Sequence, residues 1–366
     1  MLTISINLIY ISFVFYGILQ IFSLIKLNKN LYHGKREMPI KFVLSFCLIF
    51  SVYAYCVPDF AGHALILKLL SESKESHIEP FYDWLGKFVN CDYLLFRIII
   101  YSVIYYCLFV IMKKYSANKK IFVLFFIIWM LSPISNLIRS SLSDVIAFLG
   151  ILAFYRNPGN VKNFLILLIF IIPSFYLHKS AFMLIVPLAL SFLPLNKRKS
   201  LIYAILFPII TIAANFVMSY LFKTYFVNSS YSSMQEGINL TYIIRNVVVF
   251  CVNFMVWLFI IRKTTYLAHS RTLYGYIYRF LFFGLIIWSA TTLLPISSYV
   301  GYRFFGHCLI PIVLLATYLA SKSSFIVKSK LYMYSVCLVI INIINGYYSV
   351  YALSLHLEKE FWYIMK

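Results

Sequence analysis

The chain has 366 residues, of which 63% are hydrophobic and 12% charged, and its formal net charge is +21. Its apolar runs are too many and too continuous for the core of a water-soluble protein. They also lack the alternation of apolar and polar residues that marks the strands of a transmembrane barrel. The composition therefore predicts an all-α, polytopic integral membrane protein.

Basic residues are concentrated in short clusters between the apolar runs, and six clusters hold 21 of the 32 lysines and arginines. The clusters span 26–41, 113–120, 156–162, 197–199, 262–279 and 322–330. This distribution is typical of the positive-inside rule, so we interpret the clusters as cytoplasmic loops. The net charge is thereby explained without a nucleic-acid partner, and none is expected.

The clusters divide the chain into hairpins that leave the cytoplasmic face and return to it, with both termini outside. About twelve helices are expected, in one transmembrane domain of residues 1–366. The expected spans are 4–25, 41–57, 94–112, 121–138, 141–155, 163–177, 180–195, 201–222, 242–261, 274–294, 303–321 and 331–349. The main extracytoplasmic loops are expected near 58–93 and 223–241.

Acidic residues gather in the first of these outward loops, where six of the 11 Asp and Glu residues lie between positions 59 and 92. The positive-inside rule does not require this, so the loop calls for an explanation of its own. Asp59 and Glu79 are the candidates. Either carboxylate can serve as a base, or can bind sugar hydroxyls beside the aromatic residues of segment 81–84.

Three further motifs fall at the outermost points of hairpins: Arg139, the His178-Lys179 pair and Arg303. At 1.5 Å per residue, the legs of the hairpins that carry Arg139 and His178 span roughly 26 Å, which is less than a hydrocarbon core of about 30 Å. We therefore expect these turns to lie slightly below the outer headgroups, where they form a recessed, cationic pocket.

The residue types in these turns suit chemistry on a phosphorylated substrate. A guanidinium binds phosphate through paired hydrogen bonds, which we expect of Arg139 and Arg303, with Lys179 as a third cation. Hydroxyls at positions 140, 141 and 143 are expected to assist Arg139, and Asp144 to orient it. An imidazole exchanges protons near neutral pH, so His178 is expected to accept a proton from an attacking hydroxyl.

Structural roles for the same residues stay open, because an arginine at a helix end also extends to lipid phosphates. A histidine at a helix end often has only a structural role as well. No Cys or His spacing in the sequence resembles a zinc site, and there is no glycine-rich phosphate loop. We expect no metal ion, nucleotide or other cofactor.

The order of these motifs resembles that of the EpsG-like family of exopolysaccharide, capsule and O-antigen clusters, in which many members are identified as Wzy-type polymerases. The resemblance covers roughly residues 40–320. It rests on Asp59, Ile78-Glu79-Pro80-Phe81, Arg139 at the head of a helix, Leu177-His178-Lys179-Ser180-Ala181 and Tyr302-Arg303-Phe304. The sequence departs from the family pattern at Ser140, where glutamine commonly follows the arginine, and at Phe81, where glycine often follows Glu-Pro.

The resemblance implies a membrane glycosyltransferase of GT-C-like architecture in the bacterial inner membrane, with its active site facing the periplasm. It implies a polymerase that joins oligosaccharide repeat units carried on undecaprenyl pyrophosphate. In these terms His178, Glu79 and Asp59 are the candidate catalytic residues. Pyrophosphate binding is expected from Arg139, Lys179 and Arg303. The implied partners are the lipid-linked oligosaccharide, the bilayer, a chain-length regulator and a flippase.

Other functions stay open, namely a flippase for lipid-linked oligosaccharide, a membrane acyltransferase that modifies the polysaccharide, and a lipid-linked single-sugar transferase. A flippase needs charged groups that are accessible from both faces, and transporters often contain internal repeats. In this sequence the candidate residues lie at one face and no repeat is visible, which favours an enzyme over a flippase.

Overall fold

The computed structural model describes residues 6–32, 39–54, 67–68, 70–72, 79–196, 199–206, 209–210, 213, 240–292 and 298–356. Every regular element in these ranges is a helix, which confirms the all-α prediction. Five of the described helices are long and apolar enough to cross a membrane: Asn7–Tyr32, Tyr93–Tyr115, Ile138–Arg156, Phe304–Lys322 and Phe325–Tyr348. The chain is therefore a polytopic membrane protein, and the larger number of about twelve spans stays a prediction.

The chain divides into two compact units, residues 183–315 and the remainder. The first unit holds α1 (Ile6–Tyr32), α2 (Ile40–Val52), α4 (Pro80–Phe88), α5 (Tyr93–Tyr115), α6 (Lys119–Phe125), the π-helix η1 (Phe126–Met130), α7 (Leu131–Asn136), α8 (Ile138–Arg156), α9 (Val161–Leu177) and α15 (Phe325–His356). The second unit holds α10 (Ile185–Leu190), α12 (Leu240–Lys263), the 3-10 helix η4 (Thr265–Leu267), α13 (Leu273–Thr292) and most of α14 (Ser298–Lys322). The 3-10 helix η2 (Lys179–Leu184) crosses the boundary between them.

Most expected spans coincide with a helix, and three regions differ. The expected span 121–138 is formed by three consecutive helical segments, α6, η1 and α7, of which the middle one, η1, is a π turn. The expected span 180–195 contains only the short η2 and α10. A further helix, α4, lies inside the region that we expected to be an outward loop. Most of the expected span 201–222 and residues 223–239 of the expected loop 223–241 lie outside the described residues, while the last two residues of that loop belong to α12.

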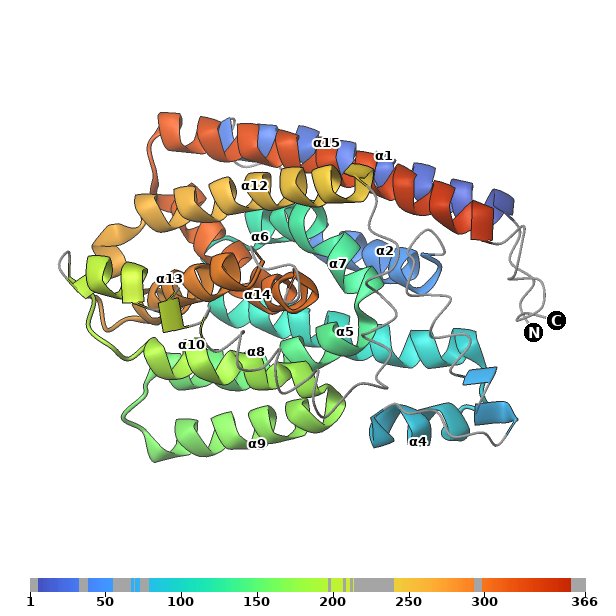
Figure 1. Ribbon diagram of the computed structural model, residues 1–366, viewed down its shortest axis with the longest axis horizontal. Helices are drawn as coiled ribbons and strands as arrows, with labels where there is room; N and C mark the ends of the chain where they lie inside the picture. Colours follow the sequence, from blue (N-terminus) through green and yellow to red (C-terminus); the bar gives the residue numbers. More distant parts are fainter. Residues whose placement is uncertain are drawn as a thin grey trace. The chain divides into compact units, whose positions relative to one another are not determined.

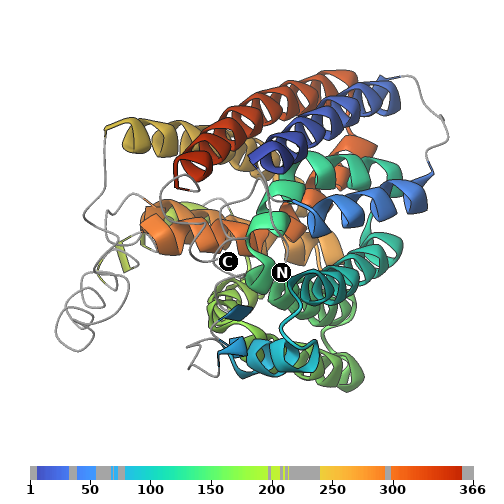
Figure 2. The same ribbon diagram turned by 90° about the vertical axis from the view of Figure 1, so that its right-hand side faces the viewer.

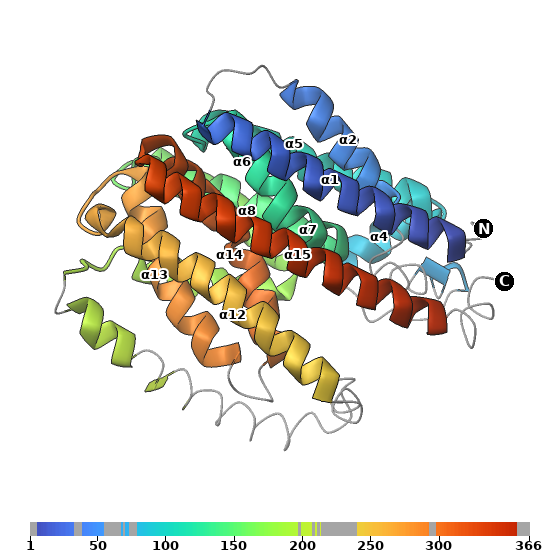
Figure 3. The ribbon, with the colours of Figure 1, turned by 90° about the horizontal axis from the view of Figure 1, so that it is seen from above.

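The first and last helices of the first unit, α1 and α15, pack side by side in antiparallel orientation (Figures 1, 2 and 3). The Tyr32 ring near the end of α1 lies 4.9 Å from the Phe325 ring at the start of α15, between centroids. Towards the other end of the pair, the Phe13 and Tyr347 centroids are 6.3 Å apart. A Cβ atom at position 346 would lie 2.8 Å from the Phe13 ring, so Gly346 permits this close approach.

Side chains of α1 and α15 also satisfy the irregular turn η1. A π turn disturbs the regular α-helical ladder, and main-chain carbonyls in an apolar interior need hydrogen-bond donors. The carbonyl oxygen of Ile127 accepts a 2.6 Å hydrogen bond from Gln20 Nε2 of α1. The carbonyl oxygen of Ile128 accepts a 2.9 Å bond from Asn342 Nδ2 of α15. Two amide side chains from opposite ends of the sequence thus hold one turn.

In the second unit, a buried arginine caps helix ends. Arg279 lies within α13 and is 5% exposed. Its Nε donates to the carbonyl of Ser191 at 2.5 Å, and its Nη1 donates to the carbonyls of Ala268 and Ser270 at 2.9 Å each. Ser191 follows α10 and Ala268 follows η4, so one guanidinium fixes both ends. This member of the basic cluster 262–279 is therefore a buried structural residue rather than a loop residue.

Replacing Asn342 with leucine is expected to lower the stability of the protein by about 0.5–2 kcal/mol, because the carbonyl of Ile128 loses its donor. The measurement is thermal unfolding of the detergent-solubilised protein. Asn30→Leu is the matched control, since the Asn30 amide donates to Lys26 within its own helix. Equal melting temperatures for the two variants would contradict the proposed role of Asn342.

Candidate functional site

The site is built on an antiparallel hairpin of α8 and α9, whose arms of 19 and 17 residues are nearly equal (Figure 1). Asn160 caps α9 by accepting a 2.9 Å hydrogen bond from the Lys162 amide. The arms pack closely at Gly150, where a Cβ atom would lie 2.9 Å from Cβ of Phe170. Because the arms match in length, the first turn of α8 and the residue after α9 meet at the same end of the hairpin.

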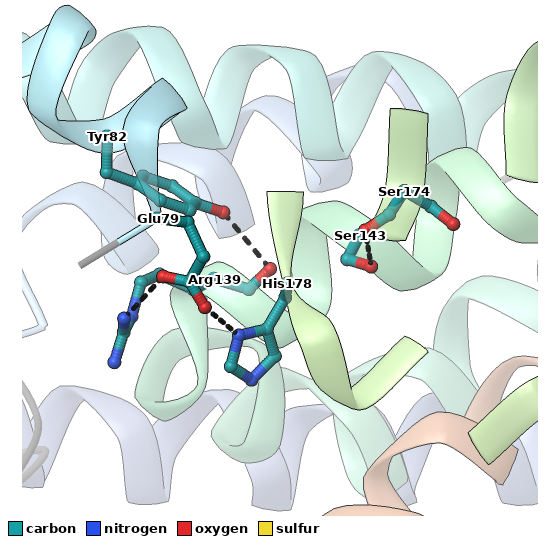
Figure 4. A network of polar contacts seen from close by, with 6 residues as sticks. All are labelled: Glu79, Tyr82, Arg139, Ser143, Ser174 and His178. Carbon is teal, nitrogen blue, oxygen red and sulfur yellow. Dashed lines mark hydrogen bonds and ion pairs between the residues drawn. The ribbon is translucent and has the colours of Figure 1, made fainter. Parts of the chain in front are cut away.

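Both arms end where the backbone leaves helical geometry. Leu137, with φ −100° and ψ 59°, separates α7 from α8, and His178, with φ −159° and ψ 121°, ends α9. These breaks confirm the expected turns next to Arg139 and at His178. The carbonyl of Ser174 accepts a 2.8 Å hydrogen bond from Ser143 Oγ (Figure 4). The Ser143 hydroxyl, which we expected to assist Arg139, ties α8 to α9 instead.

A single carboxylate joins the two arms to α4. Glu79 is the N-cap residue of α4, yet its side chain extends to the hairpin (Figure 4). Its Oε1 lies 2.6 Å from Nδ1 of His178, and its Oε2 lies 2.7 Å from Nη1 of Arg139. The side chains of Glu79 and His178 are 10% and 8% exposed, while that of Arg139 is 26% exposed. Glu79 thus contacts two other predicted site residues, Arg139 and His178, which lie 60 and 99 positions further along the chain.

The charges of this cluster follow from its contacts. Burial opposes ionisation of Glu79, but the hydrogen bond with His178 and the positive charge of Arg139 prevail and lower its pKa to about 2. The carboxylate is therefore ionised at neutral pH, with both oxygens engaged. An ionised carboxylate only accepts hydrogen bonds, so Nδ1 of His178 carries a proton. Proton exchange between His178 and a ligand must then use Nε2.

Tyr82, one turn into α4, supports the same arrangement. Its hydroxyl donates a 3.2 Å hydrogen bond to the carbonyl of Arg139, at the start of α8 (Figure 4). Burial, together with the negative charge of Glu79, raises the pKa of Tyr82 well above its usual value, so the phenol stays a donor. The Tyr82 ring lies 6.3 Å from that of Phe96 in α5, between centroids.

Of the remaining predicted site residues, Lys179, Asp59 and Arg303, only Lys179 has its side chain among the described residues. Lys179 directly follows His178 and is exposed on η2. Asp59 lies outside the described residues, and so does the side chain of Arg303 in α14. Among the described residues, the acidic partner of the Arg139 side chain is Glu79, at 2.7 Å, and the expectation that Asp144 orients this arginine stays a prediction. Asp144 is buried further along α8.

Sequence reasoning missed a polar layer next to the break that precedes α8. Arg97 of α5 is 2% exposed, and it donates to the carbonyl of Ser51 at 2.5 Å and to the hydroxyl of Tyr93 at 2.8 Å. Ser51 Oγ lies 3.0 Å from Ser135 Oγ, and the Ser135 carbonyl accepts a 2.8 Å bond from Tyr101. The layer ties α7 to α2 and α5. The sequence feature that could have predicted this layer is Arg97 itself, because an arginine inside an apolar run needs polar partners.

The Glu79 contacts predict a specific acid sensitivity. An unfolded carboxyl protonates near pH 4.5, whereas folded Glu79 protonates near pH 2, so the stabilisation is complete above pH 4.5 and is lost as the pH falls towards 2. Its upper limit is about 3 kcal/mol. Glu79→Gln is expected to weaken the acid dependence of thermal unfolding in this window, whereas Asp92→Asn, at the exposed cap of α5, retains it. An unchanged dependence in Glu79→Gln would refute this account.

Comparison with known proteins agrees with the motif order. A family model described as the EpsG family matches residues 59–358. The matched range begins at Asp59 and includes every other predicted site residue, together with α4, the α8–α9 hairpin and α14. No curated protein and no solved structure matches the chain. Since the matched region covers most of the 366 residues, this chain belongs to the EpsG family, which is associated with exopolysaccharide biosynthesis.

Proposed function

We propose that this protein is a polysaccharide polymerase that joins oligosaccharide repeat units carried on undecaprenyl pyrophosphate. The observation that carries the proposal is the Glu79 carboxylate, which holds an imidazole and a guanidinium side by side. Such a polymerase needs a base for the acceptor hydroxyl and a cation for the departing pyrophosphate. The imidazole of His178 and the guanidinium of Arg139 are groups of these two kinds.

The reaction is a glycosyl transfer that needs no metal in this proposal. Nε2 of His178 accepts the proton of the acceptor's sugar hydroxyl, and the hydroxyl oxygen attacks the anomeric carbon of the donor chain. The new carbon–oxygen bond forms as the bond to the pyrophosphate oxygen breaks, and undecaprenyl pyrophosphate leaves with the electron pair. Arg139 stabilises the negative charge of the leaving group, and we assign Lys179 and Arg303 to the same task.

In this mechanism Glu79 positions the two groups and is not the base, because both of its oxygens are engaged and its pKa is low. It holds the imidazole with a proton on Nδ1 and stabilises the imidazolium that forms when Nε2 takes up a second proton. Among the described residues, the side chain of Arg139 contacts Glu79 through Nη1, and its other N–H groups are directed to the substrate phosphates in our proposal. Asp59 stays a second candidate for the base.

The orientation of the protein belongs to the proposal as well. Lys113 and Lys114 lie in the last turn of α5, and Arg156 ends α8, so both helices carry basic residues at the end remote from the site. Lys162 similarly lies in the first turn of α9, whose other end reaches His178. Basic helix ends favour the cytoplasm. We therefore place the site at the periplasmic face of a bacterial inner membrane, in a chain of about twelve spans.

The proposal is tested by deleting the gene and complementing it with Arg139→Ala or His178→Ala. We expect loss of long polysaccharide, while lipid-linked single repeats are still exported. The losses should be at least about 100-fold, the usual scale for removing a general base or a charge-stabilising group. Polymer length is measured on gels of extracted glycan, and single repeats are measured in the lipid fraction.

The chain offers matched controls for both substitutions. Arg156→Ala removes an exposed arginine from the opposite end of α8, and His269→Ala removes an exposed histidine from the second unit. Both controls should make polymer of normal length. Repeat units that accumulate on the cytoplasmic face in the site variants would identify a flippase instead. Full-length polymer that lacks acetyl groups would identify an acyltransferase.

A further inference from the structure

The short helix α4 has three chemically distinct faces. Tyr82, Leu85 and Val89 are 1%, 3% and 3% exposed and form the face that packs against the protein. Gly86 lies on the same face, where a Cβ atom would lie 2.9 Å from the side chains of both Leu67 and Leu70. This face therefore fits closely onto the first unit, and the other two faces point away from it.

The second face is aromatic and exposed. Trp84 and Phe88, four residues apart on the same side of the helix, are 58% and 66% exposed. Their rings stack with centroids 5.5 Å apart, and the half-buried Phe81 ring lies tilted against Trp84, with a centroid distance of 6.2 Å. An exposed aromatic surface of this kind is unfavourable in water, because it leaves a large apolar area hydrated.

The third face is charged. Asp83 and Lys87, also four residues apart, form a 3.0 Å ion pair in which the Lys87 side chain is exposed and that of Asp83 is half-buried. Each face thus has exposed side chains, Trp84 and Phe88 on the aromatic face and Lys87 on the charged face, and the two faces are separated around the helix. In water alone, the aromatic face would keep a large apolar area hydrated, and in hydrocarbon alone, the charged face would lose its hydration. The separation fits a helix at the boundary between the two media.

The position of α4 in the chain agrees with such a boundary. The turn between α4 and α5 contains Asn90 and Cys91, with positive φ angles of 52° and 57°. Asp92 then caps α5 by accepting a 2.7 Å hydrogen bond from the amide of Leu95. Helix α5 is one of the candidate membrane spans, so its capped, polar start marks an end of the span. Helix α4 therefore lies next to a membrane surface.

We infer that the Phe81–Trp84–Phe88 face of α4 contacts the lipid bilayer at the boundary between headgroups and acyl chains, while the Asp83–Lys87 face meets water. Tryptophan and other aromatic residues are favoured at this depth. Because Glu79 is the N-cap residue of α4, the helix fixes the depth of the Glu79–Arg139–His178 cluster relative to the membrane surface. The inference concerns membrane contact and holds whether or not the protein is a polymerase.

The test uses tryptophan fluorescence of the full chain in phospholipid nanodiscs. The emission of Trp84 is obtained as the difference between the unmodified protein and Trp84→Phe, which isolates it from the other tryptophans. We expect strong quenching by lipids brominated near the headgroup end of their acyl chains, and weak quenching by iodide in the water. Lipids brominated near the chain ends should quench less.

A control on the same helix separates lipid contact from simple exposure. Lys87→Trp, placed in the Trp84→Phe background, moves the indole to the charged face and should reverse the preference between brominated lipid and iodide. Circular dichroism establishes that both variants fold. Strong iodide quenching of Trp84 without quenching by brominated lipid would overturn the inference and place the aromatic face in water, where it could receive a glycan.

Discussion

The candidate site depends on one buried carboxylate. Glu79 accepts from His178 through one oxygen and from Arg139 through the other, so its two contacts fix the relative position of α4, α8 and α9. An ionised carboxylate with little exposure is stable only beside positive charge and hydrogen-bond donors. The same contacts that keep Glu79 ionised therefore hold a proton-accepting group next to a phosphate-binding group.

The rest of the first unit can be understood as support for this contact. The α8–α9 hairpin brings Arg139 and His178 to one end, and the Ser143–Ser174 bond keeps its arms in register. Tyr82 links α4 to the start of α8, while the polar layer around Arg97 ties α7 to its neighbours just before that start. Each of these contacts restricts the position of a segment that carries a site residue.

Main-chain carbonyls account for much of the polar chemistry inside the two units. Gln20 and Asn342 donate to carbonyls of the π turn, Arg97 donates to the carbonyl of Ser51, and Arg279 donates to carbonyls at helix ends. Without water in an apolar interior, a carbonyl outside the helical ladder needs a donor from a side chain. Polar residues at these positions therefore have structural roles, which distinguishes them from the Glu79 cluster.

The sequence by itself determined the class of the protein, most helices and the turns next to Arg139 and at His178, because apolar runs and basic clusters are local features of the chain. It also indicated Glu79, Arg139 and His178 separately, since charged groups between apolar runs stand out. It did not predict α4, whose three faces have too few residues each to give a clear period, or the π turn in η1. Only the tertiary structure decided that Glu79 is a partner of Arg139 and that Ser143 bonds to α9. The partners of Glu79 lie 60 and 99 residues away, so they are determined by how the helices pack, and local sequence patterns do not reveal that packing.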